Sequence, residues 1–236
     1  MCPGGFWGFR HEIGLPQSVR AGSVTQPPAD PPTGAPGRIA VTGLPHVVVA
    51  VASDFSRNPH PSSVAARGDS GSRPVVEERG RLLDLLRSGT APHLVYLFCH
   101  GLVSDAGLPA LRVGAPDSAP ISPDGLADMS WDTHPLVILN GCRTTAVEPR
   151  YAMNFMDVLV RDAAAAGVVG TEVMTHEGLA ATFGDLLLDG WLQPEDGIGI
   201  GAAMRRARLG LLAGGNPLGL IYVAYAAPQL RMVPTP

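Results

Sequence analysis

The chain has 236 residues, of which 45% are hydrophobic, and it carries a net charge of -4 at pH 7. A chain of this length can bury a sizeable core, and we expect one main domain. Its 17 Lys and Arg residues are scattered rather than gathered in a stripe, which excludes nucleic acid and anionic membrane surfaces as expected partners. The start of the chain shows neither a basic leader nor a long apolar run, which predicts a soluble cytoplasmic protein.

The cysteine pattern argues against disulfides and bound metal. Cys2, Cys99 and Cys142 are odd in number and lack the spacing of metal ligands, so we expect neither a disulfide framework nor a zinc site. The glycine-rich run at 197–201 follows no predicted strand and has no phosphate-binding lysine, which argues against nucleotide binding. The sequence therefore predicts no metal and no cofactor.

A Pro- and Gly-rich stretch divides the chain unevenly. Residues 26–37, "QPPADPPTGAPG", cannot hold a helix or a central strand. We therefore expect residues 1–37 to form an N-terminal segment with a linker, and residues 38–236 to form the folded domain. The aromatic residues of "FWGFRHEI" at 6–13 leave two interpretations: this segment packs on the domain, or it is the cut end of a longer protein.

Apolar runs alternate with helical patterns from residue 45 onward. The β-branched run at 45–53 predicts a buried strand. The stretch 54–73 should hold a crossover helix, because parallel strands need one, but it offers only a stub near 64–67. It is therefore either an eroded helix or a mobile loop. A very short strand is expected at 75–76, followed by a leucine-spaced helix that ends at Gly89.

The same rhythm continues to the end of the chain. Strands are predicted at 93–99, 136–139, 167–173 and 218–226, and helices at 152–166, 175–192 and 198–215. Strands that alternate with helices favour a parallel sheet covered on both faces. The expected fold class is α/β: a three-layer α/β/α sandwich around a mostly parallel, twisted sheet of about six strands.

Two strand ends carry residues with the chemistry of a base and a nucleophile. His100 and Cys142 each lie just past the end of a predicted strand, and the carboxyl ends of strands form the functional crevice of open α/β sheets. If these strands are neighbours, about 5 Å apart, an imidazole and a thiol face each other. Considered alone, His100 would be a polar strand end and Cys142 a small buried residue. The paired pattern is what predicts a dyad.

The expected reaction uses the neighbouring glycines as well. Only a thiolate attacks well, and an imidazole can take the thiol proton and later protonate a leaving amine. Gly101 and Gly141 let the backbone turn sharply, so that the N–H groups of Gly101 and Cys142 can point at an oxyanion. Cys99 alternates to the opposite face of its strand and is expected to pack in the core.

Three stretches resemble a known family. "LVYLFCHG" at 94–101, "PLVILNGCRTTA" at 135–146 and "NPLGLIYVAYAAPQL" at 216–230 are similar to the CHAT domain, the bacterial branch of the caspase-like cysteine peptidases. The resemblance covers roughly residues 45–230. It implies a caspase-like fold and hydrolysis of peptide bonds in a protein or peptide substrate.

The resemblance assigns roles to particular residues. His100 matches the family histidine, Cys142 the nucleophile and Gly101 the oxyanion glycine. Asn140, two residues before the nucleophile, matches a residue that helps form the substrate pocket. Glu177, with Glu172 as the second choice, matches an acidic residue of that pocket that would favour Arg or Lys.

The pocket is also where the sequence departs from the family. The family often has a Trp and an Asp where this chain has Val173 and His176, which leaves the specificity of the pocket open. From the residues alone, Glu172 and Glu177 could equally be exposed charges at the start of a helix.

Three functions are compatible with these residues. The favoured one is a cysteine endopeptidase in bacterial defence or regulated cell death, controlled by a partner protein or sensor domain, because CHAT domains tend to be fused to such modules. The second is a catalytically silent interaction module with the same fold. The third is a small-molecule hydrolase or acyltransferase that uses the same thiol, for which a closed pocket rather than an open groove is expected.

Overall fold

A five-stranded sheet forms the centre of the computed structural model, which describes residues 7–15, 37–69, 75–88, 91–104, 107–146, 154–193 and 197–235. The strands lie in the order β2 (Val47–Val51), β3 (Leu94–Phe98), β6 (Leu136–Asn140), β7 (Gly167–Thr171) and β8 (Tyr222–Ala226). The first four are parallel and β8 is antiparallel to β7. Every residue of β2, β3, β6 and β7 is buried, as expected for parallel strands that are covered on both faces.

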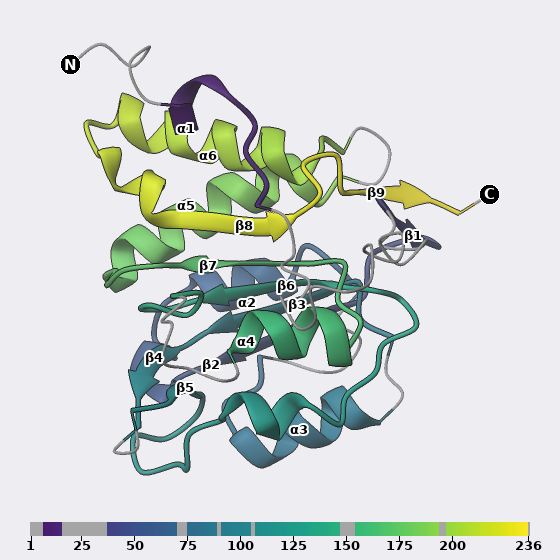
Figure 1. The fold of residues 1–236 in the computed structure, drawn as a ribbon, viewed down its shortest axis with the longest axis vertical. Coiled ribbons are helices and arrows are strands. Elements are labelled where there is room, and N and C mark those ends of the chain that lie inside the picture. The colour runs from purple at the N-terminus through teal and green to yellow at the C-terminus, as the bar shows by residue number, and fades with distance from the viewer. Residues whose placement is uncertain are drawn as a thin grey trace, which may run out of the picture.

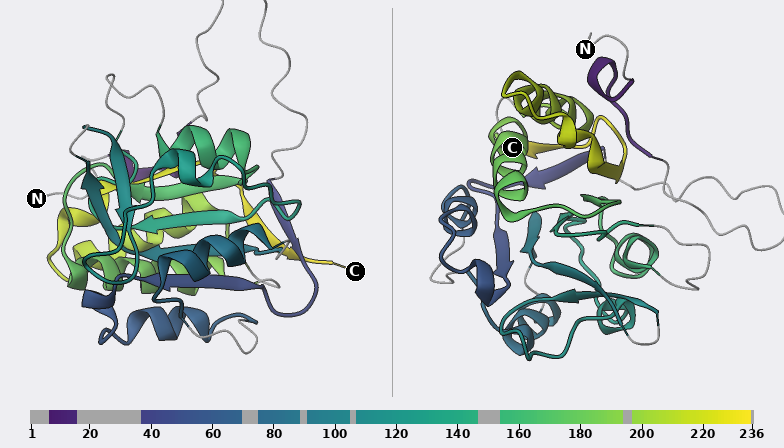
Figure 2. Two further views of the ribbon diagram at one scale, coloured as in Figure 1. Left: turned by 90° about the horizontal axis from the view of Figure 1, so that it is seen from below. Right: turned by 90° about the vertical axis from the view of Figure 1, so that its left-hand side faces the viewer.

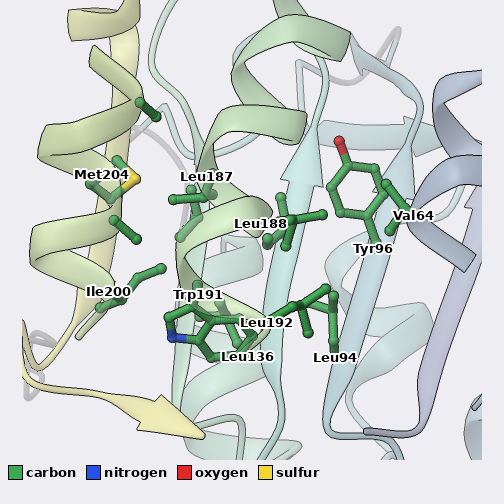
Figure 3. Packing of buried hydrophobic residues seen from close by; sticks show 14 of the residues in the cluster. Val64, Leu94, Tyr96, Leu136, Leu187, Leu188, Trp191, Leu192, Ile200 and Met204 are labelled. Carbon is green, nitrogen blue, oxygen red and sulfur yellow. The ribbon is translucent and has the colours of Figure 1, made fainter. Parts of the chain in front are cut away.

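Helices cover the two faces of the sheet and form two separate apolar layers (Figure 1, Figure 2). One face packs against α2 (His60–Ala65), α5 (Glu177–Trp191) and α6 (Ile200–Ala213). In that layer Tyr96 of β3 lies with Val64 on one side and Leu188 on the other (Figure 3). The other face packs against α3 (Arg79–Arg87) and α4 (Phe155–Asp157), which continues as a π-helical turn. The predicted three-layer α/β/α architecture is therefore confirmed.

Two small strand pairs lie at opposite ends of the central sheet (Figure 1). The antiparallel hairpin of β4 (His100–Val103) and β5 (Pro109–Arg112) follows the carboxyl end of β3. The parallel pair β1 (Arg38–Val41) and β9 (Arg231–Pro234) lies at the other end. The sequence did not predict the hairpin, because its central residues lie in a stretch rich in Pro and Gly.

The crossover after β2 is shorter than a full connecting helix. Residues 53–55 form a 3₁₀ turn and α2 then spans only His60–Ala65, with Pro61 in the first turn, where a missing N–H costs nothing. The short helical segment predicted near 64–67 therefore begins earlier than expected, at His60. Val76 forms an isolated parallel bridge to Ala50, as predicted, whereas Gly89 lies outside the described residues.

The segment before the linker packs on the domain. In α1 (Trp7–Arg10), Phe9 is 3% exposed, and its carbonyl accepts a hydrogen bond from Nε of Arg205 at 2.9 Å. Arg208 is 5% exposed and donates to the carbonyl of Tyr222 at 2.6 Å. The face of α6 that carries Arg208 is therefore buried against α1 and the start of β8 rather than solvated. No helix in the described part of the chain has both the length and the apolar character needed to cross a bilayer.

Candidate active site

The register of two neighbouring strands brings His100 and Cys142 to one place. In the parallel pair β3–β6, Phe98 lies opposite Asn140, so the residues two positions later leave the sheet side by side. The backbones touch there, because a Cβ placed on Gly101 would lie 1.6 Å from the carbonyl oxygen of Cys142. The expectation that these two strands are neighbours is confirmed.

The imidazole of His100 is held by a carboxylate and an aromatic ring. His100 begins β4, and its Nε2 lies 3.0 Å from Oδ2 of Asp54. Its ring also packs against Phe55, with 4.5 Å between the ring centroids. Because the carboxylate occupies Nε2, Nδ1 is the ring nitrogen that remains for a proton transfer.

Asp54 is kept ionised by its neighbours. Its Oδ2 also accepts from Nη2 of Arg112 at 3.3 Å, and Arg112 lies opposite His100 in the hairpin. Desolvation acts to raise the pKa of Asp54, but the hydrogen bond from His100, its own backbone amide and the charges of His100 and Arg112 outweigh this effect and lower the pKa. A carboxylate that stays charged favours an imidazole that carries its proton on Nε2.

The thiol of Cys142 faces the backbone of Thr175. Sγ–H donates to the carbonyl oxygen of Thr175 at 3.2 Å, and the N–H of the same residue faces Sγ at 3.4 Å. In the described part of the chain, the thiol makes no hydrogen bond to His100, and the N–H of Cys142 donates none either. That N–H is therefore available to a ligand in the crevice.

Threonine side chains hold the turn that carries Cys142. Thr171 Oγ1 donates to the carbonyl of Gly141 at 2.5 Å, and Thr144 Oγ1 donates to the carbonyl of Leu139 at 2.7 Å. Arg143 has φ of +52°, a left-handed conformation that costs free energy in a residue with a side chain. Such strain persists where the surroundings fix the backbone, and here it lies directly after the nucleophile candidate.

Gly141, the glycine before Cys142, permits a close approach of the ends of β6 and β3. A Cβ on Gly141 would lie 2.2 Å from the carbonyl oxygen of Cys99, so no other residue fits without moving the strand ends. Cys99 itself is 2% exposed and packs in the layer with α3. Burial raises its pKa to about 12, with a smaller contribution from Cys142. The prediction that Cys99 is a core residue is confirmed.

The residues expected to line the substrate pocket lie at different depths. Asn140 is 1% exposed, and its side-chain amide bonds to Tyr96, Tyr222 and the carbonyl of Ala180. It therefore supports the end of β6 from within the α5 layer.

The two glutamates are exposed and interact with different parts of the chain. Glu177 begins α5 and accepts from Nδ2 of Asn58 at 2.7 Å, which joins it to the loop that bears Asp54. Glu172 follows β7 beside the phenol of Tyr225, whose pKa is raised by burial and, to a lesser extent, by Glu172. Glu177 is therefore connected to the loop of Asp54, whereas Glu172 lies on the β8 side.

Two residues of this site escaped the sequence analysis. Asp54 is the first acidic residue after β2, and β2 lies beside β3, so the rule that strand ends form the crevice applied to the first strand would have found it. Thr175 contributes its backbone, and no sequence signal marks such a role.

His176 caps α5, with its Nδ1 accepting from the N–H of Leu179 at 3.2 Å. Among the described residues, no group of three or more His, Cys, Asp or Glu side chains is arranged to hold a metal.

The fold is that of the caspase-like cysteine peptidases. One similar structure is a chain of the Saccharomyces cerevisiae separase–securin complex, with a TM-score of 0.57 and 14% identity over 84% of this chain and 13% of that one. Another is the Arg-specific cysteine proteinase gingipain R, with a TM-score of 0.55 and 12% identity over 83% of this chain and 47% of that one.

The family follows from the sequence comparisons. The family model of the CHAT domain matches residues 8–226, so the chain belongs to the CHAT domain family. A probable protease from Vitiosangium sp. (strain GDMCC 1.1324) is 36% identical over 242 residues, which cover 98% of this chain. The chain spans 30% of the length of that relative.

Proposed function

We propose that this chain is a cysteine endopeptidase that hydrolyses peptide bonds in a protein target, with Cys142 as nucleophile and His100 as its base. The observation that carries the proposal is the strand register, which brings the two residues to one edge of the sheet with their backbones in contact. The family and the name of the relative, a probable protease, support the same class of reaction.

The proposed reaction proceeds in two halves. Nδ1 of His100 takes the proton of the Cys142 thiol, and the sulfur then attacks the carbonyl carbon of the scissile bond. The N–H groups of Gly101 and Cys142 stabilise the oxyanion, each worth about 3 kcal/mol of barrier. The imidazolium protonates the leaving amine, which breaks the C–N bond and leaves a thioester. Water then attacks the thioester, with His100 as the base, and releases the acid.

Asp54 is assigned a supporting role in this reaction. It fixes the ring of His100 through Nε2 and stabilises the imidazolium that forms after the thiol proton is transferred. Arg112 keeps the carboxylate in place from the neighbouring strand. The site is therefore proposed to act as a dyad with an orienting carboxylate.

The substrate pocket is proposed to lie beside Cys142 and to favour Arg or Lys at the cleavage site. Glu177 is its acidic wall, because Asn58 ties it to the loop of Asp54. Glu172 is the second acidic candidate, and Asn140 supports the floor from below. The net charge of -4 argues against nucleic acid and anionic membranes, and the relative named a probable protease supports a protein or peptide substrate.

We propose that the site is at rest in this structure and needs activation. The thiol gives its hydrogen bond to Thr175 rather than to His100, so this bond must break before the thiolate forms. A partner protein or a sensor domain would favour that change, and the longer relative leaves room for such a module. A thiol-dependent reaction fits the reducing cytoplasm, with bacterial defence or regulated cell death as the proposed setting.

A diverse peptide library screened with the wild type, Cys142→Ala and Cys99→Ala tests this proposal. Cys142→Ala should abolish cleavage and Cys99→Ala should retain it, because Cys99 is buried in the α3 layer whereas Cys142 is only partly buried. Equal cleavage by the Cys142→Ala variant would overturn the assignment. The products also report whether Arg or Lys precedes the scissile bond.

A catalytically silent interaction module is the second candidate. The observation that favours it is the thiol's contact with Thr175. If neither the wild type alone nor the wild type in its full-length parent cleaves a peptide or releases small acyl groups, while a partner still binds, this candidate replaces the first. Cleavage of small thioesters or esters without peptide cleavage would instead indicate a small-molecule hydrolase or acyltransferase.

A further inference from the structure

A buried chain of polar side chains runs beneath Cys142 and is not used by the proposed reaction. Asn140 ends β6 two residues before Cys142. Its Nδ2 donates to the hydroxyl of Tyr96 at 2.5 Å and to the carbonyl of Ala180 at 2.8 Å, and its Oδ1 accepts from the hydroxyl of Tyr222 at 2.7 Å. These bonds join β6 to β3, α5 and β8, so the amide fixes the position of the strand end relative to three elements.

Each hydrogen bond in this network of side chains has a defined donor and acceptor. Because the Tyr96 hydroxyl accepts from Asn140, its own hydrogen is directed at Nε2 of His60, 2.6 Å away. Nδ1 of His60 lies 3.1 Å from Oδ1 of Asp185. Burial raises the pKa of Tyr96 and of Tyr222, so both phenols keep their protons and remain donors.

Tyr222 connects β8 to the end of β6 through its hydroxyl, which donates to Asn140. Its ring stacks on Phe183, with 3.6 Å between centroids and 6° between the planes. Burial is the main cause of the raised pKa of Tyr222; the Thr175 hydroxyl acts to lower this pKa and Cys142 acts to raise it. The Thr175 hydroxyl is buried and has no hydrogen-bond partner among the described residues.

We propose that Tyr222 and Asn140 are positioning residues for Cys142: their hydrogen bond fixes the end of β6 against Thr175 and so holds the sulfur opposite the Thr175 N–H. That N–H stabilises the thiolate once the proton has left. Removing the Tyr222 hydroxyl leaves Oδ1 of Asn140 buried without a donor, which favours a shift of the strand end. The consequence for turnover rests on the proposed peptidase function, whereas the effect on the thiol does not.

Tyr222→Phe tests this role, because it removes one hydroxyl and keeps the ring that stacks on Phe183. The measurement is the rate at which iodoacetamide alkylates Cys142, followed by peptide mass spectrometry across pH. The midpoint of this profile should move to higher pH and the rate at pH 7 should fall about tenfold, since small misplacements cost up to about 100-fold. On a cleavable peptide, kcat should fall while KM changes less than about twofold.

Trp191→Phe is the matched control. It also removes a buried hydrogen bond from the same layer, the one from Nε1 to the carbonyl of Leu230 at 3.1 Å, but it does not touch the chain of polar residues. It should lower the melting temperature and leave the alkylation profile unchanged. An equal shift in Trp191→Phe, or an unchanged profile in a folded Tyr222→Phe, would overturn the positioning role.

Tyr96→Phe keeps the inference testable if Tyr222→Phe does not fold. It removes the hydroxyl that accepts from Nδ2 of Asn140, but Nδ2 keeps its bond to the carbonyl of Ala180. A smaller upward shift of the same profile is therefore expected, and no shift contradicts the proposal. The two proposals fail in different ways. If the wild type cleaves no peptide but its alkylation still depends on Tyr222, the positioning role stands and the peptidase function falls.

Discussion

The imidazole of His100 is held by the carboxylate of Asp54, with Nε2 3.0 Å from Oδ2. This contact joins the loop after β2 to the first residue of β4, which follows β3 in the chain. Arg112 donates to the same carboxylate oxygen at 3.3 Å. The carboxylate therefore determines which ring nitrogen of His100 remains for the thiol.

Asp54→Asn should lower kcat by about 100-fold, because an amide cannot stabilise the imidazolium and permits the wrong tautomer. KM should change little, since Asp54 does not contact the substrate in the proposed reaction. The measurement is the steady-state rate on a peptide found in the library screen. Wild-type activity should also fall in acid as the pH drops through the lowered pKa of Asp54, below the usual 3.8.

Asp128→Asn is the control for this substitution. Asp128 is an exposed carboxylate that pairs with Arg87 of α3 at 2.9 Å and, within the described part of the chain, forms no hydrogen bond or ion pair with His100 or Cys142. Its replacement should leave kcat unchanged. If both variants lose activity equally, or if Asp54→Asn keeps the wild-type rate, the orienting role of Asp54 is wrong.

The two described cysteines should differ in reactivity. Burial raises the pKa of Cys99 to about 12, so at pH 8 it carries almost no thiolate. Cys142 is only partly buried and should react first with iodoacetamide in the folded protein. Mass spectrometry of the labelled peptides checks this order, and denaturant should make both thiols equally accessible. Modification of Cys99 before Cys142 under native conditions would contradict the structure.

Gly101→Ala should abolish activity. The new Cβ would lie 1.6 Å from the carbonyl oxygen of Cys142, so the strand ends must separate and the oxyanion donors move apart. Gly125→Ala is the control, because its Cβ would meet nothing closer than 3.7 Å. Peptide cleavage and circular dichroism should show a folded but inactive Gly101→Ala and an active Gly125→Ala. Retained activity in Gly101→Ala would show that this backbone contact is not needed.

The sequence predicts the sheet well because its strands are apolar on both faces. The sequences of β3 and β6 are apolar almost throughout, which indicates buried strands. Their ends are marked by His100 and by Gly141 with Cys142. Five strands form the central sheet and Val76 adds a single parallel bridge to β2, which agrees with the predicted sheet of about six strands. The antiparallel direction of β8 carries no local signal, since direction depends on the connection and not on the strand itself.

The sequence predicts the candidate site only where a single side chain, such as a thiol or an imidazole, indicates the chemistry by itself. A thiol and an imidazole at strand ends are visible in the sequence. Asn140 was expected at the substrate pocket, but its hydrogen bonds to Tyr96 and Tyr222 come from strands 44 and 82 residues away. Such a network depends on which strands become neighbours, and the backbone role of Thr175 depends on a turn that any residue type could form.

His60 should make the stability of the fold depend on pH. It is 3% exposed, and burial lowers its pKa from 6.5, against the opposing effect of Asp185, while Arg67 lowers it further. Its Nε2 also faces the Tyr96 hydroxyl. Because the unfolded chain then binds the proton more readily than the folded one, stability should be complete above about pH 6.5 and should fall as the pH drops below that value.

Melting temperatures measured between pH 7.5 and pH 5 by circular dichroism check this dependence. His60→Gln removes the titrating group and should flatten the slope in part. Burial and the charge of His46 also lower the pKa of His93, so this residue contributes to the same window. The double variant with His93→Gln should therefore be flatter still. If His60→Gln keeps the full wild-type slope, His60 is not buried in its neutral form, and the direction assigned to its bond with Tyr96 is wrong.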